Sequence, residues 1–281
     1  MLSQDNKTSK QTKFMVSAIQ MASGPNVDAN LFEAERLISK AVSAGAGLCV
    51  LPENFSIMGM TEYEKVSIRE EDGKGPIQEF LAEQAKKHHI WLVGGTVPLR
   101  ANVDNKIRAA CILYDPEGNR VARYDKTHLF DVHILDSNEQ YDESETIEAG
   151  SEVVVVQKPS FNIGFAICYD LRFPELFREM HAQDVELIVI PSAFTAITGK
   201  AHWETLVRAR AIENLSFVIA SDQGGYHING RESYGDSMIV DPWGQVLDRL
   251  HSGSGYVIAE IDLGYLRETR KRFPALTHRK F

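Results

Sequence analysis

The sequence predicts an α/β fold built as one large domain. Strand patterns and amphipathic helix patterns alternate along the chain, and no linker, low-complexity tract or change in composition interrupts them. The composition, 43% hydrophobic and 25% charged, is typical of a soluble globular protein. We therefore expect residues 14–281 to form a single domain and the polar residues 1–13 to form a flexible tail.

The first half of the chain alternates short apolar strands with helices. Phe14–Met21 is predicted to be a strand, and the next helix is expected to begin at Asn30, because Glu33 then occupies the capping-box position. Gly45 ends that helix, and Leu48–Leu51 follows as a short apolar strand. The remaining elements expected here are a helix over Pro76–His88, a strand over Ile90–Pro98, and a hairpin formed by Ala109–Asp115 and Arg120–Lys126.

The second half continues the same alternation after a polar stretch, Asp131–Gly150, that is predicted to be a long loop. Loops of that length are uncommon in compact domains and often functional. Strands are expected at Val153–Val156, Ile163–Cys168, Leu187–Pro191, Phe217–Ser221, Ser237–Asp241 and Tyr256–Ile261. Helices are expected at Pro174–Gln183, His202–Leu215 and Leu263–Arg272.

Charge and hydropathy exclude several classes of function. The net charge of −9 argues against nucleic-acid or acidic-membrane binding, which needs clustered Lys and Arg. No stretch reaches the roughly 18 apolar residues of a membrane span, and residues 1–13 lack the apolar core of a signal peptide. Cys49, Cys111 and Cys168 form no disulfide framework, so we expect a cytoplasmic protein.

One cysteine stands where chemistry is favoured. Cys168 ends an apolar strand pattern, just before a helix with Pro174 in its first turn. By itself, such a cysteine is more often a buried structural thiol, as Cys49 and Cys111 are expected to be. Two further strand exits, however, bear Glu53 and Lys126. In open α/β sheets functional sites gather outside the strand ends, so these three side chains are candidates for one cleft.

A glutamate, a lysine and a cysteine are sufficient for acyl transfer. Glu53 would take the proton of the Cys168 thiol, and the thiolate would attack a carbonyl carbon. The ammonium group of Lys126 and a backbone N–H would stabilise the tetrahedral oxyanion. Glu53 would then protonate the leaving amine and later activate water against the thioester.

These residues resemble the Glu-Lys-Cys triad of the nitrilase superfamily of carbon–nitrogen hydrolases. The match is collinear and spans essentially the whole chain after the first dozen residues. Glu143 resembles the second glutamate of that family, which positions the lysine and the substrate. The residues around Cys168 are similar to the Nit-type amidase branch. Four further segments agree with that branch: Pro191–Phe194, Thr198–Glu204, Arg208–Asn214 and Asp241–Gly244.

The resemblance implies a four-layer α-β-β-α sandwich, a homodimer or higher homo-oligomer, and hydrolysis of a small linear amide without a cofactor or metal. A 2-oxo acid amide such as deaminated glutathione is the first expected substrate, and 2-oxoglutaramate, the substrate of ω-amidases, is the alternative. Arg172 and Thr198, with Tyr169 and Phe194, are implied to contact the substrate. The Arg172 fork suits a carboxylate, although it could instead pair with Asp170 or Glu175 as a structural clamp.

Other interpretations stay open at this stage. A regulatory protein could bind a small molecule in the same cleft without turnover. His128, Asp131 and His133 look superficially like metal ligands, but their spacing matches no zinc pattern and Lys126 would repel a cation. One departure from the family is Asp236, where relatives often have histidine; if that position lines the cleft, it affects substrate preference.

Overall fold

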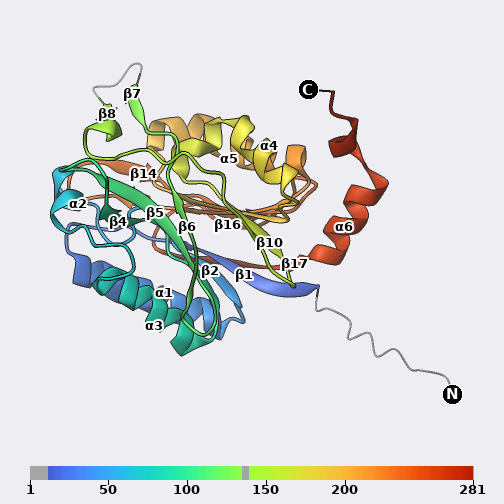
Figure 1. Ribbon diagram of the computed structural model, residues 1–281, viewed down its shortest axis with the longest axis horizontal. Helices are drawn as coiled ribbons and strands as arrows, with labels where there is room; N and C mark the ends of the chain where they lie inside the picture. The colour runs from blue at the N-terminus through green and yellow to red at the C-terminus, as the bar shows by residue number, and fades with distance from the viewer. Residues whose placement is uncertain (1–11, 135–138, 281) are drawn as a thin grey trace.

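A computed structural model describes residues 12–134 and 139–280. Two β-sheets lie face to face, and helices cover their outer faces, as Figure 1 shows. The expected four-layer α-β-β-α sandwich is therefore confirmed. The expected tail, residues 1–13, lies almost entirely outside the described residues; Lys13 already belongs to the first strand.

The first sheet has seven strands, and its central part is parallel. In spatial order they are β17 (Gly255–Asp262), β1 (Lys13–Gln20), β2 (Leu48–Val50), β3 (Trp91–Val93), β5 (Ile107–Tyr114) and β4 (Val97–Arg100), with β6 (Arg120–Asp125) also paired to β5. Because β3 and β6 are both antiparallel to β5, β6 runs in the same direction as β2. The exits of β2 and β6 consequently lie at the same edge of the sheet.

The second sheet has six strands around a parallel centre. In spatial order they are β16 (Val246–Leu250), β15 (Ser237–Val240), β12 (Phe217–Asp222), β11 (Leu187–Ser192), β10 (Asn162–Phe165) and β9 (Val155–Gln157). Two small ribbons complete the strands: β7 (Asp131–His133) with β8 (Gln140–Asp142), and β13 (Gly224–Tyr226) with β14 (Glu232–Tyr234).

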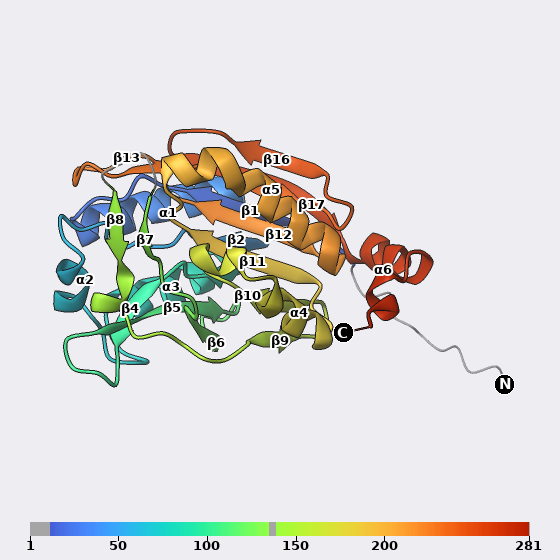
Figure 2. The ribbon, with the colours of Figure 1, turned by 90° about the horizontal axis from the view of Figure 1, so that it is seen from above.

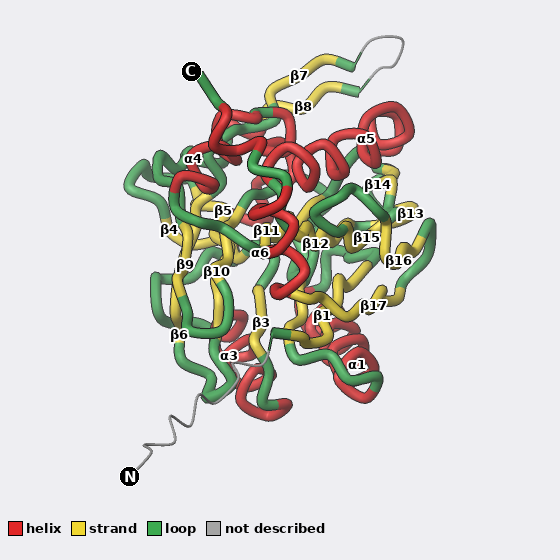
Figure 3. The backbone as a smooth tube through the Cα atoms, turned by 90° about the vertical axis from the view of Figure 1, so that its right-hand side faces the viewer, coloured by secondary structure: helices red, strands yellow, loops and turns green. Residues whose placement is uncertain are grey.

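Helices form the two outer layers. Helices α1 (Val27–Ser43) and α3 (Pro76–His88) cover the first sheet, and α4 (Pro174–Ala182) and α5 (Ala196–Asn214) cover the second; Figures 2 and 3 show the same layers from two further directions. Helix α6 (Leu263–Arg272) lies beyond one end of the sheets, at the right in Figures 1 and 2. Short helices are α2 (Tyr63–Ser67), η1 (Glu143–Glu145), η2 (Cys168–Arg172) and η3 (Ala275–His278).

Strand β2 illustrates how the layers bury its side chains. Leu48 and Val50 face the second sheet and join the core between the sheets, whereas Cys49 and Leu51 join the core beneath α1 and α3. Alternate side chains of a strand point to opposite faces, so a strand covered on both faces is apolar throughout. Cys49, like Cys111, is fully buried, as expected for a structural thiol.

Several element boundaries differ from the sequence expectation. Helix α1 begins three residues earlier than predicted, because the side chain of Asn26 caps it by accepting a hydrogen bond from Ala29 N. Asn30 is instead buried and bonds to the carbonyls of Gly24 and Ser56. The expected strand over Ile90–Pro98 is divided into β3 and β4, because Gly95 between them has φ +53°, outside the strand region.

The second half of the chain holds the other differences. Helix α5 begins at Ala196, six residues before the predicted start. The expected loop over Asp131–Gly150 includes the ribbon β7–β8 and the helix η1. The sequence did not predict the strands β13, β14 and β16. They are short, and each includes glycine or polar residues that interrupt an apolar pattern.

Candidate active site

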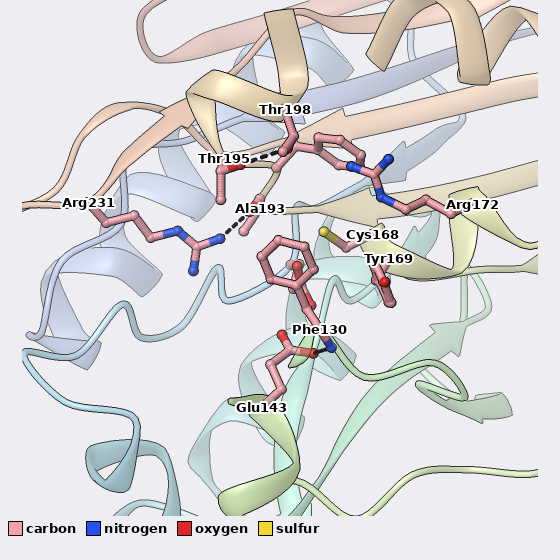
Figure 4. A pocket seen from close by; sticks show the side chains of 11 residues that line it. Phe130, Glu143, Cys168, Tyr169, Arg172, Ala193, Thr195, Thr198 and Arg231 are labelled. Atoms are coloured by element: carbon pink, nitrogen blue, oxygen red, sulfur yellow. Dashed lines mark hydrogen bonds between the residues drawn. The ribbon is translucent and has the colours of Figure 1, made fainter. Parts of the chain in front are cut away.

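A cavity with about 270 Å³ of space, partly open to solvent, lies at the edge where the strand exits meet. Glu53, Glu143 and Cys168 line one part of it, and Arg172, Phe194 and other side chains line the rest. Figure 4 shows Glu143, Cys168 and Arg172 around this space. Residues from six separate stretches of the chain therefore surround one small space.

Glu53 follows β2 in a tight turn. Asn54, the next residue, has φ +57°, and its N–H donates to Thr96 Oγ1 over 2.8 Å. The carbonyl of Glu53 accepts a 2.9 Å hydrogen bond from Gln223 Nε2, which reaches across from the end of β12. The turn is thus attached to both sheets, and Glu53 is 3% exposed.

Lys126 follows β6 and is almost fully buried. Its N–H donates to the Ala109 carbonyl at 3.0 Å, and its own carbonyl accepts from Gly150 N at 2.8 Å, so the backbone is held on both sides. Its Nζ lies 2.8 Å from Glu53 Oε1 and 2.8 and 2.7 Å from the two carboxylate oxygens of Glu143. One ammonium group therefore joins two carboxylates that lie 90 residues apart in the sequence.

Glu143 opens the short helix η1 and is positioned by a second donor. Its Oε2 accepts a 2.8 Å hydrogen bond from Phe130 N as well as the bond from Lys126. Because the carboxylate has a fixed donor on the backbone, Lys126 Nζ is held at a defined place beside Glu53.

Cys168 lies three residues beyond the end of β10, in a backbone conformation that is unusual for a residue other than glycine. Its φ is +46°, a left-handed value that costs about 1–3 kcal/mol and persists only where neighbours enforce it. Asp170 supplies that constraint: Oδ2 accepts from Ile167 N at 2.8 Å and from Tyr124 OH at 2.7 Å. Asp170 Oδ1 accepts from the N–H of His128 at 2.9 Å.

Burial and neighbouring charges favour a neutral thiol at Cys168 but the charged forms of Glu53 and Lys126. Burial raises the pKa of the Cys168 thiol well above its usual value, and the negative charge of Glu53 raises it further, so the resting group is the neutral thiol. Burial would also raise the pKa of Glu53, but the charge and hydrogen bond of Lys126 outweigh it and lower that pKa. For Lys126, burial is outweighed by Glu143 and Glu53, and its pKa lies well above the usual value.

The four side chains expected to contact substrate all line this cavity: Tyr169, Arg172, Phe194 and Thr198. The guanidinium of Arg172 lies over the rings of Phe194, at 5.1 Å from the centroid, and Tyr169, at 5.7 Å. Its Nη1 lies 3.2 Å from His202 Nδ1. Within residues 12–134 and 139–280, no carboxylate forms an ion pair with Arg172, so the structural clamp considered above is not formed.

Sequence reasoning missed Arg231, Phe130 and Thr195, which also line the cavity. Arg231 precedes the short strand β14, and Phe130 precedes β7, in segments without hydrophobic periodicity. Thr195 immediately precedes α5, and its Oγ1 lies 2.7 Å from Thr198 Oγ1. Their proximity depends on how the loops fold back over the strand exits, and no local pattern in the sequence indicates it.

Asp236 does not line the cavity. Its side chain is buried and forms hydrogen bonds with Arg249 Nε at 2.9 Å and Arg249 Nη2 at 2.5 Å. It also lies 2.9 Å from His251 Nδ1. This departure from the family pattern is therefore a structural ion pair and gives no reason to alter the expected substrate.

His128 and Asp131, two of the three residues that look like metal ligands in the sequence, make structural contacts instead. The Nδ1 atom of His128 lies 2.7 Å from Asp170 Oδ1, and its ring stacks on Phe173 with centroids 3.7 Å apart. Asp131 accepts a hydrogen bond from Ser144 N. Among the residues with described positions, no three His, Cys, Asp or Glu side chains are grouped as metal ligands. The described helices likewise include none with the length and apolarity needed to cross a membrane.

Comparison with known proteins agrees with this geometry. Residues 15–271 match the family model described as carbon-nitrogen hydrolase. A Synechocystis protein named deaminated glutathione amidase is 42% identical over 271 residues, covering 95% of this chain and 98% of the relative.

Two solved structures share the fold. The NitFhit protein of C. elegans has a TM-score of 0.87 and 36% identity, and the match covers 96% of this chain but 65% of that longer one. Saccharomyces cerevisiae Nit3, described as a member of branch 10 of the nitrilase superfamily, has a TM-score of 0.85 and 28% identity, with 96% and 97% of the two chains covered.

Proposed function

The chain belongs to the carbon–nitrogen hydrolase family, and from this premise we propose that it is an amidase that hydrolyses deaminated glutathione through a thioester on Cys168. The main support for the proposed catalytic residues is one observation. Lys126 Nζ contacts Glu53 and Glu143 in a buried position beside the Cys168 thiol. The name of the Synechocystis relative supports the substrate.

Catalysis begins with the neutral thiol, because the pKa of Cys168 is raised. Glu53, ionised because its pKa is lowered, takes the thiol proton as the sulfur attacks the amide carbon. Negative charge then develops on the carbonyl oxygen. The Lys126 ammonium and a backbone N–H that follows Cys168 stabilise that oxyanion.

Collapse of the tetrahedral intermediate breaks the C–N bond, and Glu53 gives its proton to the leaving amine. The acyl group stays on Cys168 as a thioester. Glu53 next removes a proton from water as the water oxygen attacks the thioester, and the thiolate leaves and regains the proton. Glu143 keeps Lys126 protonated and in place throughout, since its two oxygens lie 2.8 and 2.7 Å from Nζ.

The position of Arg172 also supports this substrate. Its guanidinium lies in the cavity without a carboxylate partner in the described part of the chain, and a planar fork of donors binds a carboxylate in two places. The 2-oxo acid arm of deaminated glutathione ends in such a group. 2-Oxoglutaramate has the same arm but releases ammonia, so it is the alternative substrate and the natural comparison.

The test combines product analysis with mass spectrometry. The enzyme should release 2-oxoglutarate and cysteinylglycine from deaminated glutathione, and rapid quenching should show one 2-oxoglutaryl adduct on the peptide that includes Cys168. Cys168→Ala should lose both turnover and adduct, whereas Cys49→Ala, which changes a core thiol, should keep both. Turnover by Cys168→Ala would overturn the mechanism. Binding without turnover or adduct in the wild type would instead indicate a regulatory binding protein.

We make three further proposals, each with its own support. Residues 14–281 fold as one domain, the protein is cytoplasmic, and it forms a homodimer. Strand β1 pairs with β17, Phe14 opposite Ile261, so the first and the last strand of the described residues share one sheet. The three cysteines are buried and unpaired, which suits a reducing compartment. Trp243 and Phe273 are exposed and pack on each other with ring centroids 5.4 Å apart, and this exposed apolar pair supports a contact with a second copy of the chain. A single cooperative unfolding transition and a dimer mass by light scattering are the expected results.

A further inference from the structure

A second arginine faces the catalytic cavity from the side opposite Arg172. Arg231 precedes β14, and its guanidinium reaches the cavity wall, so that the Cys168 sulfur lies between the two arginines in Figure 4. The catalytic mechanism described above needs neither guanidinium for proton transfer. Both are therefore available to the substrate.

The guanidinium of Arg231 is only partly satisfied within the protein. Its Nη2 donates to the Ala193 carbonyl, and the group lies 5.2 Å from the centroid of the Tyr141 ring. Its Nε is buried and has no hydrogen-bond partner among the described residues. No carboxylate of residues 12–134 or 139–280 lies within ion-pair distance of it. A buried charged donor without a partner is costly, and this cost is recovered when a ligand supplies an acceptor.

Arg231 also lies where the catalytic cavity meets an adjoining cleft. It and Glu143 line both the catalytic cavity and an adjoining cleft that runs along residues 59–62 and the strand β8. Side chains of Glu53, Cys168, Arg172 and Phe194 enclose the catalytic cavity closely. An amide with a peptide-sized leaving group therefore places its acyl arm in the cavity and directs its leaving group past Arg231 into the cleft.

The charges of the cleft make this contact selective. The other charged residues along it are acidic, namely Glu62, Asp142, Glu143 and Glu145, and Arg231 is its one basic residue. Glu62 and Glu143 are already paired with Lys65 and Lys126, so Arg231 is the one cationic group lining the cleft that is left for an entering carboxylate. A leaving group with a terminal carboxylate is thus oriented, whereas ammonia gains nothing from Arg231.

We propose that Arg231 is a specificity-determining residue that binds the carboxylate of the leaving group, while Arg172 binds the carboxylate of the acyl arm. The inference rests on the proposed function and refines it: the preferred substrates are amides with a carboxylate on each side of the scissile bond. Deaminated glutathione, with one carboxylate on its 2-oxo arm and one on its glycine, has this form; 2-oxoglutaramate has only the first.

The test compares three substrates in the full-length enzyme: deaminated glutathione, its C-terminal glycinamide, and 2-oxoglutaramate. In Arg231→Met, kcat/KM for deaminated glutathione should fall relative to 2-oxoglutaramate by about tenfold or more, mainly through KM, because a charged hydrogen-bonded contact is lost. Arg231→Lys should restore part of the ratio of kcat/KM for deaminated glutathione to kcat/KM for 2-oxoglutaramate. The wild type should disfavour the glycinamide by a similar factor, and Arg231→Met should not distinguish it from the acid.

Arg172→Met is the matched control, because it should reduce turnover of all three substrates together. Thermal unfolding of each variant checks that the ratio is measured on folded protein. An unchanged ratio in Arg231→Met, or a wild type that treats acid and glycinamide alike, overturns the role of Arg231 and leaves the proposed function intact. A wild type that hydrolyses none of the three substrates overturns the proposed function, and this inference with it.

Discussion

Replacing Lys126 by methionine tests how much its ion pairs with Glu53 and Glu143 contribute to the free energy of unfolding. Methionine is similar in length but removes the Nζ that lies 2.8 Å from Glu53 Oε1 and 2.7 Å from Glu143 Oε2. Glu53 is 3% exposed, so its carboxylate would be left in the interior without a cation. Removing one partner of a buried ion pair costs about 3–5 kcal/mol, and we expect this loss in the free energy of unfolding at neutral pH.

The pH dependence of that loss follows from the pKa of Glu53. In the wild type Lys126 outweighs burial and lowers this pKa, so Glu53 contributes stability above about pH 4.5 and loses it as the pH falls. Without Lys126, burial raises the pKa above its unfolded value. The variant is then most stable below about pH 4.5 and loses stability as the pH rises. The difference between the two proteins should widen from about pH 5 to about pH 8.

Urea unfolding followed by tryptophan fluorescence measures this difference. Adding Glu53→Gln and Glu143→Gln to the Lys126 variant should recover most of the lost stability, because no buried charge remains unpaired. Lys87→Met is the surface control: it breaks a 2.6 Å ion pair with Glu35 that is largely exposed, and should cost less than about 1 kcal/mol. A Lys126→Met loss below about 1 kcal/mol at pH 8, or an equal loss at pH 5, would refute the reasoning.

Three further perturbations address the turns and the protonation states. Asp170→Asn weakens the constraint on the left-handed Cys168 backbone; we expect about 1–3 kcal/mol less stability and slower thioester formation, by urea unfolding and quenched flow. The pH profile of kcat/KM should stay level from neutral pH down to below about 4.5, where Glu53 is protonated. A rising limb near the pKa of a free thiol, about 8.5, would contradict a raised pKa at Cys168. Gly95→Ala, at φ +53° with an added Cβ 2.2 Å from the Pro52 carbonyl, should displace the Glu53 turn and lower both stability and kcat.

The local sequence determined the elements from which the site is built. The apolar strands that end near Glu53, Lys126 and Cys168 were recognisable because a strand buried on both faces is apolar throughout. Their alternation with amphipathic helices indicated an α/β fold and hence side chains gathered at strand ends. The resemblance of these segments to one family then indicated the two facing sheets and the second glutamate, Glu143.

Only the tertiary structure decided which polar groups meet. Lys126 Nζ bonds to Glu53 and Glu143, and Tyr124 OH bonds to Asp170, because segments distant in sequence meet at the strand exits. The positions of Arg231 and Asp236 were equally beyond sequence reasoning, since both lie in short irregular segments where hydrophobic periodicity is absent. Periodicity reports which face of an element is buried, whereas a catalytic contact depends on distances across the fold, and these are fixed by packing of the complete sandwich.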